Sequence, residues 1–140
     1  MPRIELFGWE SARAEASRIR TEVFVREQRV PAEIEMDEHD AACLHALAYV
    51  DGKAVGTGRL LPDGHIGRMA VLRESRASGV GSAILLRLID EARRRGMREV
   101  RLSAQTHALD FYARHGFVAV GGVFEEAGIP HQEMRLTLNS

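Results

Sequence analysis

Two glycines separated by one residue, Gly79 and Gly81, follow Arg76 in the segment RASGVGSAILL and give the spacing RxxGxG. The apolar period after Gly81 predicts a helix, so the glycines mark the place where a strand turns into a helix. Glycine lets successive backbone amides face one concavity, and a helix start adds unpaired amides and partial positive charge there. The segment therefore predicts a turn that binds an anion, and a phosphate suits it best.

Two familiar phosphate-binding motifs do not match this turn. A P-loop needs a Lys-Ser/Thr pair that the segment lacks, and Ile84 stands where a dinucleotide fingerprint has its third glycine. A tight strand-to-helix turn that uses glycine for packing alone is the alternative interpretation, and these residues by themselves leave both open.

The elements around this turn follow from hydrophobic patterning. Ile4 and Leu6 predict a first strand, Ser11 a helix N-cap, and the Asp51-Gly52 pair a hairpin between two apolar runs. A turn at Pro62 to Gly64 precedes the predicted strand HIGRMAV. The apolar stripes are Ala12, Ala16, Ile19, Val23 and Phe24 in a first helix that ends before Pro31, and Ile84, Leu85, Leu88, Ile89 and Ala92 in a second that Gly96 ends.

The C-terminal half continues the alternation of strands and helices. EVRLSA is a predicted strand, ALDFYARHG a short helix that Gly116 closes, and FVAVGG and HQEMRLTL two more strands. The acidic stretch at 32–42 is a predicted loop with a helical turn. The order is strand, helix, three strands, helix, strand, helix, two strands, which indicates an α/β fold with a mixed sheet.

Composition narrows the function classes. The 140 residues suit one domain, 1–140, and a net charge of -1 argues against nucleic acid or a membrane surface as the main partner. A single cysteine, Cys43, allows no intramolecular disulfide, and we find no signal peptide and no long apolar run, so a cytoplasmic location is expected. The six histidines show no zinc-ligand spacing, and no metal site is expected.

The strand HIGRMAV, the glycine turn and its helix, the strand VRLSAQ and the segment ALDFYARHGF together resemble the GNAT superfamily of acyl-CoA-dependent N-acetyltransferases. RxxGxG and AxxFYxxxGF are both present, in the order and spacing typical of that family, and the resemblance runs from about Lys53 to Phe117. It implies the GNAT fold, a mixed and mostly antiparallel central sheet flanked by helices, within one N-acetyltransferase domain.

The resemblance also implies a binding site for acetyl-CoA as acyl donor. Main-chain groups of Met69, Ala70 and Val71 would bind the pantetheine arm as an added strand would. Gln105 stands where the family usually has an asparagine, seven residues before its tyrosine. The groups that would hold the CoA pyrophosphate are Arg76 and the amides of Ser78, Gly79, Val80, Gly81 and Ser82.

Tyr112 matches the tyrosine that, in this superfamily, protonates the departing CoA thiolate. The ordinary pKa values of a phenol and a thiol make that proton transfer only about 2 kcal/mol uphill, a difference that a local environment can remove. A Phe-Tyr pair that packs in the core with a satisfied hydroxyl is the competing interpretation.

The acceptor amine must lose a proton before it attacks. For an alkylamine at neutral pH this costs about 4.6 kcal/mol, so a general base or a water chain is expected. The sequence leaves several candidates open for a base or substrate contact, and the carboxylates of the acidic stretch would together attract a cationic amine. They are Glu35, Asp37, Glu38, Asp40, Glu126 and His131.

The segment from Arg20 to Asp40, together with Arg59, resembles ElaA-like small bacterial members of the superfamily, and FEEAGIPHQEM near the end resembles them again. The first of these patterns is also similar to acyl-homoserine-lactone synthases, which use S-adenosylmethionine. We therefore expect direct acetyl transfer to a small-molecule or peptide amine, with a lactone-synthase-like enzyme or a non-catalytic acyl-CoA-binding module as alternatives. The resemblance suggests a homodimer, and Cys43 lies outside the cofactor motifs, so no covalent acyl-enzyme is expected.

Overall fold

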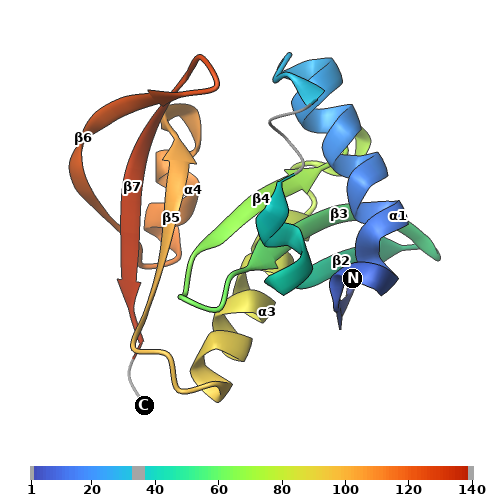
Figure 1. Cartoon of the computed structure of the whole chain (residues 1–140), viewed down its shortest axis with the longest axis horizontal. Coiled ribbons are helices and arrows are strands. Elements are labelled where there is room, and N and C mark those ends of the chain that lie inside the picture. The colour runs from blue at the N-terminus through green and yellow to red at the C-terminus, as the bar shows by residue number, and fades with distance from the viewer. Residues whose placement is uncertain (1, 33–36, 139–140) are drawn as a thin grey trace.

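The structure is a computed structural model that describes residues 2–32 and 37–138. The order of elements predicted from the sequence is confirmed (Figure 1). The strands are β1 (Arg3–Phe7), β2 (Leu44–Val50), β3 (Lys53–Leu60), β4 (Ile66–Val71), β5 (Glu99–Gln105), β6 (Val118–Glu126) and β7 (Ile129–Thr137). The helices are α1 (Trp9–Arg20), α3 (Val80–Arg94) and α4 (Leu109–Arg114), with shorter helical segments η1 (Thr21–Glu27), η2 (Glu38–Ala42), η3 (Arg73–Ser75) and η4 (Thr106–Ala108).

The described strands form two antiparallel sheets, in the orders β1-β2-β3-β4 and β5-β7-β6. Within the described residues the two sheets are linked by an isolated parallel bridge between His65 and Arg101, where the Arg101 amide donates to the Gly64 carbonyl at 3.0 Å. From that bridge the ribbons of β4 and β5 diverge (Figure 1). The mixed sheet expected from the sequence is thus mostly antiparallel and divided at its parallel step.

A bulge in β4 accompanies this division. Arg59 pairs with Gly67, but the next pair along the two strands is Thr57 with Ala70, so Arg68 and Met69 together face Gly58. Arg68 has a φ of 48°, in the left-handed region that residues other than glycine rarely adopt. A bulge bends its strand and increases the local twist, which is consistent with β4 turning away from β5.

The core lies on the two faces of the first sheet. Helix α1 packs on one face and α3 on the other (Figure 1). Every predicted apolar position of α3 is buried, and so are four of the five in the first helix, Phe24 being half-buried. Gly58 permits this close approach, because a Cβ there would lie 2.7 Å from Met69 Sδ and 3.0 Å from Ile84 Cγ2.

Several element boundaries differ from the sequence-based ones. Helix α1 begins at Trp9 with Gly8 as N-cap, so Ser11 lies inside the first turn instead of capping it. The first helix continues as η1, a π-helix in which the amide of Gln28 donates to the Val23 carbonyl at 3.1 Å. Strand β6 extends to Glu126 because the chain reverses at Ala127 and Gly128, which have φ values of 52° and 75°.

No helix among the described residues is long and apolar enough to cross a membrane.

Candidate active site

A cavity of about 840 Å³ lies between the diverging strands. Its walls come from η1, from the outer side of β4, from the C-terminal end of β5, from α4 and from the β6-β7 hairpin. Of the residues predicted to bind the donor, Met69, Ala70, Val71, Arg76, Gly81 and Gln105 line it, together with Tyr112. The fold therefore brings most of the predicted donor site to one place.

The glycine turn has the backbone of an anion-binding concavity. Ala77 and Gly79 have φ values of 63° and 86°, so the chain enters the left-handed region twice just before α3 begins at Val80. The amides of Val80, Gly81 and Ser82 make no backbone hydrogen bond to any described residue, and no side chain caps the helix. These amides are unpaired donors at the positive end of the helix dipole.

Arg76 is held by a residue that the sequence analysis did not single out. Its guanidinium donates to both carboxylate oxygens of Glu27, at 2.7 and 3.0 Å, and its Nε donates to the Val71 carbonyl at 2.9 Å. Arg73 lies 3.5 Å from the same carboxylate. The hydrogen bond from Arg76 is the main cause that lowers the pKa of Glu27 below its usual value. The end of η1 is thereby tied to the glycine turn.

The outer edge of β4 is open along the cavity. β4 is the last strand of its sheet, and its described backbone link to β5 ends at the His65 bridge. Ala70 and Val71 pair with Thr57 and Gly56 of β3 on the other side. Main-chain groups of Met69, Ala70 and Val71 that point away from β3, apart from the Val71 carbonyl that Arg76 Nε engages at 2.9 Å, can therefore bind an extended ligand, as the sheet edge would bind another strand.

Tyr112 lies on α4 with its ring packed edge-on against Phe111 and Phe117, at centroid distances of 5.0 and 5.9 Å. No hydrogen bond links its hydroxyl to another described residue. Burial raises the pKa of Tyr112 to about 12. Tyr112 lines the cavity and its hydroxyl is not among the buried unsatisfied atoms, so the hydroxyl is free to meet a ligand, as the chemical interpretation requires.

Gln105 is engaged across the cavity with Gln28, which follows η1. Each amide nitrogen donates to the other's oxygen, at 2.8 and 3.3 Å. Both residues line the cavity, so this pair links the end of η1 to the end of β5. Glu27 and Gln28 are neighbours, and they hold two of the predicted donor-binding residues, Arg76 and Gln105.

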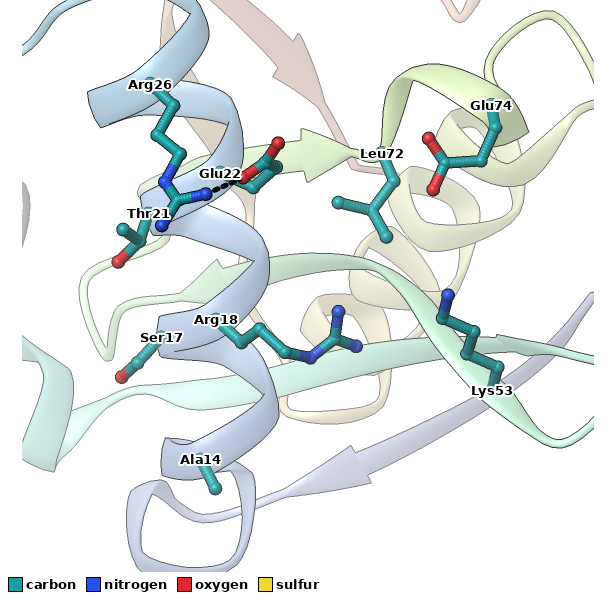
Figure 2. A pocket seen from close by; sticks show the side chains of 9 residues that line it. All are labelled: Ala14, Ser17, Arg18, Thr21, Glu22, Arg26, Lys53, Leu72 and Glu74. Atoms are coloured by element: carbon teal, nitrogen blue, oxygen red, sulfur yellow. Dashed lines mark ion pairs between the residues drawn. The ribbon is translucent and has the colours of Figure 1, made fainter.

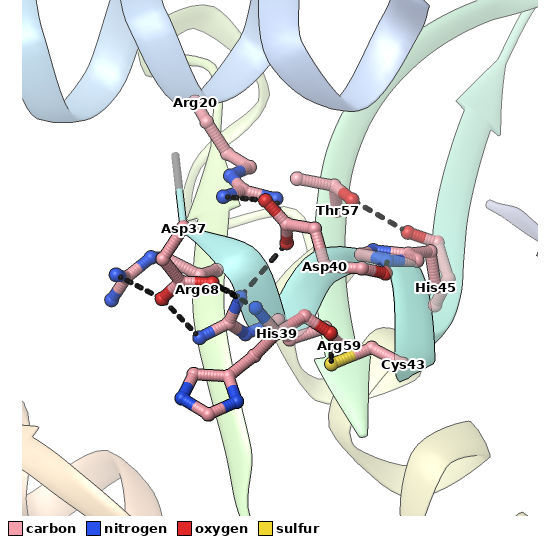
Figure 3. Close-up of polar contacts among 10 residues, drawn as sticks. Arg20, Asp37, His39, Asp40, Cys43, His45, Thr57, Arg59 and Arg68 are labelled. Atoms are coloured by element: carbon pink, nitrogen blue, oxygen red, sulfur yellow. Dashed lines mark hydrogen bonds and ion pairs between the residues drawn. The ribbon is translucent and has the colours of Figure 1, made fainter. Parts of the chain in front are cut away.

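The acidic stretch does not present free carboxylates at Asp37 and Asp40 (Figure 3). Asp40 is 2% exposed and accepts hydrogen bonds from Arg20 at 2.9 and 3.0 Å and from Arg59 at 2.8 Å. Burial alone raises the pKa of Asp40, but the hydrogen bonds and charges of the two arginines together hold it below its usual value. An acceptor amine has no access to this carboxylate, which corrects the expectation for Asp40.

Asp37 is the more exposed of the two carboxylates, and it lines the cavity. Arg59 donates to both of its oxygens at 2.8 and 3.0 Å, and Arg68 donates at 3.0 Å. The hydrogen bond from Arg59 is the largest cause that lowers the pKa of Asp37 to about 2. Its charge is thus compensated by two guanidinium groups, which weakens the expected attraction for a cationic amine.

The remaining acceptor-site candidates differ in exposure and in whether they line the cavity. Glu35 lies outside the described residues, and Glu38 is exposed and does not line the cavity. Glu126 is exposed at the rim, whereas His131 is 7% exposed and faces the same cavity. Cys43 is buried, and burial raises the pKa of its thiol to about 11, which disfavours a thiolate nucleophile.

A second cavity, of about 510 Å³, lies between α1 and η1 on one side and Lys53, Leu72 and Glu74 on the other (Figure 2). Both acidic and basic side chains line it, and Arg26 pairs with Glu22 at 3.5 Å. The lining residues are Ala14, Ser17, Arg18, Thr21, Glu22, Arg26, Lys53, Leu72 and Glu74. It contains none of the predicted site residues.

Within the described part of the chain no group of His, Cys, Asp and Glu side chains is arranged to hold a metal ion.

Comparison with known proteins agrees with this geometry. The sequence model of the family described as "Acetyltransferase (GNAT) domain" matches residues 10–138. The uncharacterized N-acetyltransferase YjcF of Bacillus subtilis is 42% identical over 120 residues, which cover 83% of this chain and 86% of that protein.

Two solved structures are similar over nearly their whole length. An acyl-CoA N-acyltransferase from Pseudomonas aeruginosa superposes with a TM-score of 0.86 at 33% identity, covering 97% of this chain and 99% of that one. Escherichia coli ElaA superposes with a TM-score of 0.85 at 28% identity, with the same coverage of 97% and 99%. The predicted GNAT fold and the resemblance to ElaA are confirmed.

Proposed function

The chain belongs to the acetyltransferase (GNAT) family and is an N-acetyltransferase, and from this premise we propose that it moves an acetyl group from acetyl-CoA to a primary amine by direct attack. Acyl-CoA is the donor class of this fold. The family match and the named relative favour this reaction over the lactone-synthase alternative and over a non-catalytic binding module.

One observation carries the proposal. The unpartnered hydroxyl of Tyr112 and the open edge of β4 face the same cavity, and the glycine turn with its unpaired amides borders it at Gly81. Phosphate recognition, binding of an extended arm and proton donation are three tasks that a CoA thioester requires. The chain supplies a group for each of them around one opening.

In this proposal the amides of Val80, Gly81 and Ser82 bind the pyrophosphate, and the free main-chain groups of β4 orient the pantetheine arm. The bulge at Arg68 removes the adjacent backbone from regular pairing with β3, so an amide there is available to a carbonyl oxygen. Such a donor stabilises the negative charge that develops on the thioester oxygen during attack.

Tyr112 acts as the general acid for the departing sulfur. With its pKa at about 12, protonating a fully hydrated thiolate would be uphill by about 5 kcal/mol. A thiolate released inside the same enclosed cavity also loses hydration, which raises its own proton affinity and narrows that gap. Desolvation of the thiolate in the same cavity therefore offsets part of the cost that burial imposes on Tyr112 as a proton donor.

The direct test is a thiol-release assay of the purified chain with acetyl-CoA and a panel of primary amines, with calorimetric titration of CoA alongside. We expect CoA to bind and thiol release to depend on the amine. Binding of CoA without amine-dependent turnover across the panel would overturn the proposal in favour of an acyl-CoA-binding module.

A further inference from the structure

His131 is a buried titratable group that the reaction described above does not use. It lies on β7, the central strand of the second sheet, opposite Gln105 of β5 and Phe124 of β6. Its ring stacks on Phe124 at a centroid distance of 6.0 Å and an angle of 23°. Since directly opposed residues project from the same face, His131 and Gln105 share one face of the sheet, and both line the cavity with Tyr112.

A backbone contact fixes which ring nitrogen of His131 carries the proton. Nδ1 lies 2.7 Å from the Ile129 carbonyl oxygen, and a carbonyl can only accept a hydrogen bond. Nδ1 is therefore the protonated nitrogen, and the neutral ring keeps its lone pair on Nε2. No hydrogen bond occupies Nε2 among the described residues, and it is not among the buried unsatisfied atoms.

We propose that His131 is the general base that removes a proton from the acceptor ammonium, an inference that rests on the proposed acetyl transfer. The Ile129 carbonyl orients the ring and stabilises the imidazolium that forms, as a hydrogen-bond acceptor does for catalytic histidines in general. His131 thus removes the proton of the acceptor ammonium, which none of the residues proposed to bind acetyl-CoA or protonate its sulfur removes.

The protons balance with two groups. His131 Nε2 takes one proton from the ammonium and later releases it to water, and the freed nitrogen lone pair attacks the thioester carbon. The carbonyl electron pair moves to oxygen and returns as the carbon-sulfur bond breaks, with the bonding pair leaving on sulfur. Tyr112 gives its proton to that sulfur and recovers one from the acylated nitrogen, so the products are an amide, a thiol and one released proton.

The other titratable groups around the cavity fit this role less well. From β5 and β6, His131 is opposed by the uncharged Gln105 and Phe124, and Glu126 lies exposed further along β6. Asp37 is paired with Arg59 and Arg68. His107 is exposed, and His65 contacts Asp63 at 3.0 Å in a pair whose side chains are 41% and 57% exposed. Arg76 and Tyr112 complete the charged and titratable lining.

The variant His131→Asn gives the sharpest test, because its amide NH₂ can replace the Nδ1 donor to Ile129 while the base at Nε2 is lost. We expect kcat with an alkylamine to fall by about 10²- to 10⁴-fold. The pH profile of kcat/KM should change shape, because the variant must capture the acceptor already unprotonated, and its kcat/KM should fall about tenfold with each unit of decreasing pH below the pKa of the amine. Added imidazole should restore part of the rate. The KM for acetyl-CoA should stay near the parental value, and His65→Asn is the matched control.

An acceptor that is already uncharged at neutral pH provides a second measurement. Because it has no proton to give up before attack, its rate should fall much less in His131→Asn, and His131→Gln replaces that variant if it does not fold. A folded variant that keeps the parental rate and pH profile, or the same change of profile in His65→Asn instead, overturns the assignment. If the parent releases no thiol with any amine, the proposed function itself fails and this inference falls with it.

Discussion

Glu27 accepts two hydrogen bonds from the guanidinium of Arg76, the arginine that begins the RxxGxG turn, across 49 positions of sequence. The carboxylate thus occupies the side chain that we propose for the CoA pyrophosphate. An arginine fork binds a carboxylate and a phosphate through the same pair of N–H groups, so ligand and Glu27 compete for it.

Replacing Glu27 by Gln should therefore tighten CoA binding by several-fold, because Arg76 becomes available without breaking a charged pair. Calorimetric titration of CoA measures this, and Glu22→Gln is the matched control since Glu22 pairs with Arg26 at 3.5 Å on an exposed surface. Weaker binding in Glu27→Gln would show that the carboxylate positions Arg76 for the ligand instead of competing with it.

The Tyr112→Phe variant keeps the ring and its packing on Phe111 and Phe117 but removes the proton. We expect kcat to fall by about 10²- to 10⁴-fold with little change in acetyl-CoA affinity. Tyr49→Phe, which alters the other tyrosine of the chain, should leave kcat unchanged. Parental turnover in Tyr112→Phe, with chemistry shown to be rate-limiting by a pre-steady-state assay, would contradict the general-acid role.

Gly81 tests whether the turn binds phosphate or only packs. A Cβ at this position would lie 3.5 Å from Phe111 Cζ, an ordinary contact, so Gly81→Ala should fold and bind CoA with modest loss. The two methyl groups of Gly81→Val would extend into the cavity beside the unpaired amides and should weaken CoA binding by about ten-fold or more, since backbone approach to the phosphates is obstructed. Equal affinity in both folded variants would assign the glycine to packing.

Asp40 bears on stability. Changing it to Asn leaves the buried guanidinium groups of Arg20 and Arg59 without their shared negative partner, and loss of one member of such a buried set costs about 3–5 kcal/mol. Chemical denaturation of Asp40→Asn should show this loss. Glu38→Gln, next to Asp37 but exposed, is the control and should change the free energy of unfolding little.

Asp37 predicts an acid-dependent loss of stability. Its pKa is lowered from 3.8 to about 2 on folding, so its stabilising contribution is fully present above pH 4 and disappears as the pH falls through about 2. The shift corresponds to about 2 kcal/mol. Denaturation measured between pH 5 and pH 2 should therefore show a shallower decline in Asp37→Asn than in the parent, whereas parallel curves would contradict the ion-pair assignment.

Local patterns predicted most of the fold. The Asp51-Gly52 turn, the apolar stripe of α3 and the stop at Gly96 each depend on residues close in sequence, and the structure confirms them. The division of the sheet was not predictable in this way. It involves a left-handed φ at Arg68, and nothing in the segment GRMAV marks an arginine for that conformation.

In the candidate site, too, features that depend on local sequence could be predicted and features that depend on distant residues could not. The glycine turn and Tyr112 could be predicted as site residues because they lie in short motifs that can be recognised in the sequence. The fates of Asp40 and Arg76 depend on Arg20 and Glu27, which lie 20 and 49 residues away, and a surface carboxylate has the same local sequence as one that closes an ion pair. The Gln28-Gln105 pair, 77 residues apart, was equally beyond local pattern.

The wide turn of η1 determines the direction in which the side chains at its C-terminal end point. A π-turn contains about one residue more than an α-turn, so each residue beyond it is rotated relative to a regular helix. Glu27 and Gln28 face Arg76 and Gln105 in this delayed phase. Deleting a single residue from η1 would return the segment to α-helical spacing and turn both side chains by about 100°. The contacts of Glu27 with Arg76 and of Gln28 with Gln105 therefore constrain how many residues η1 contains, and not only which residues they are.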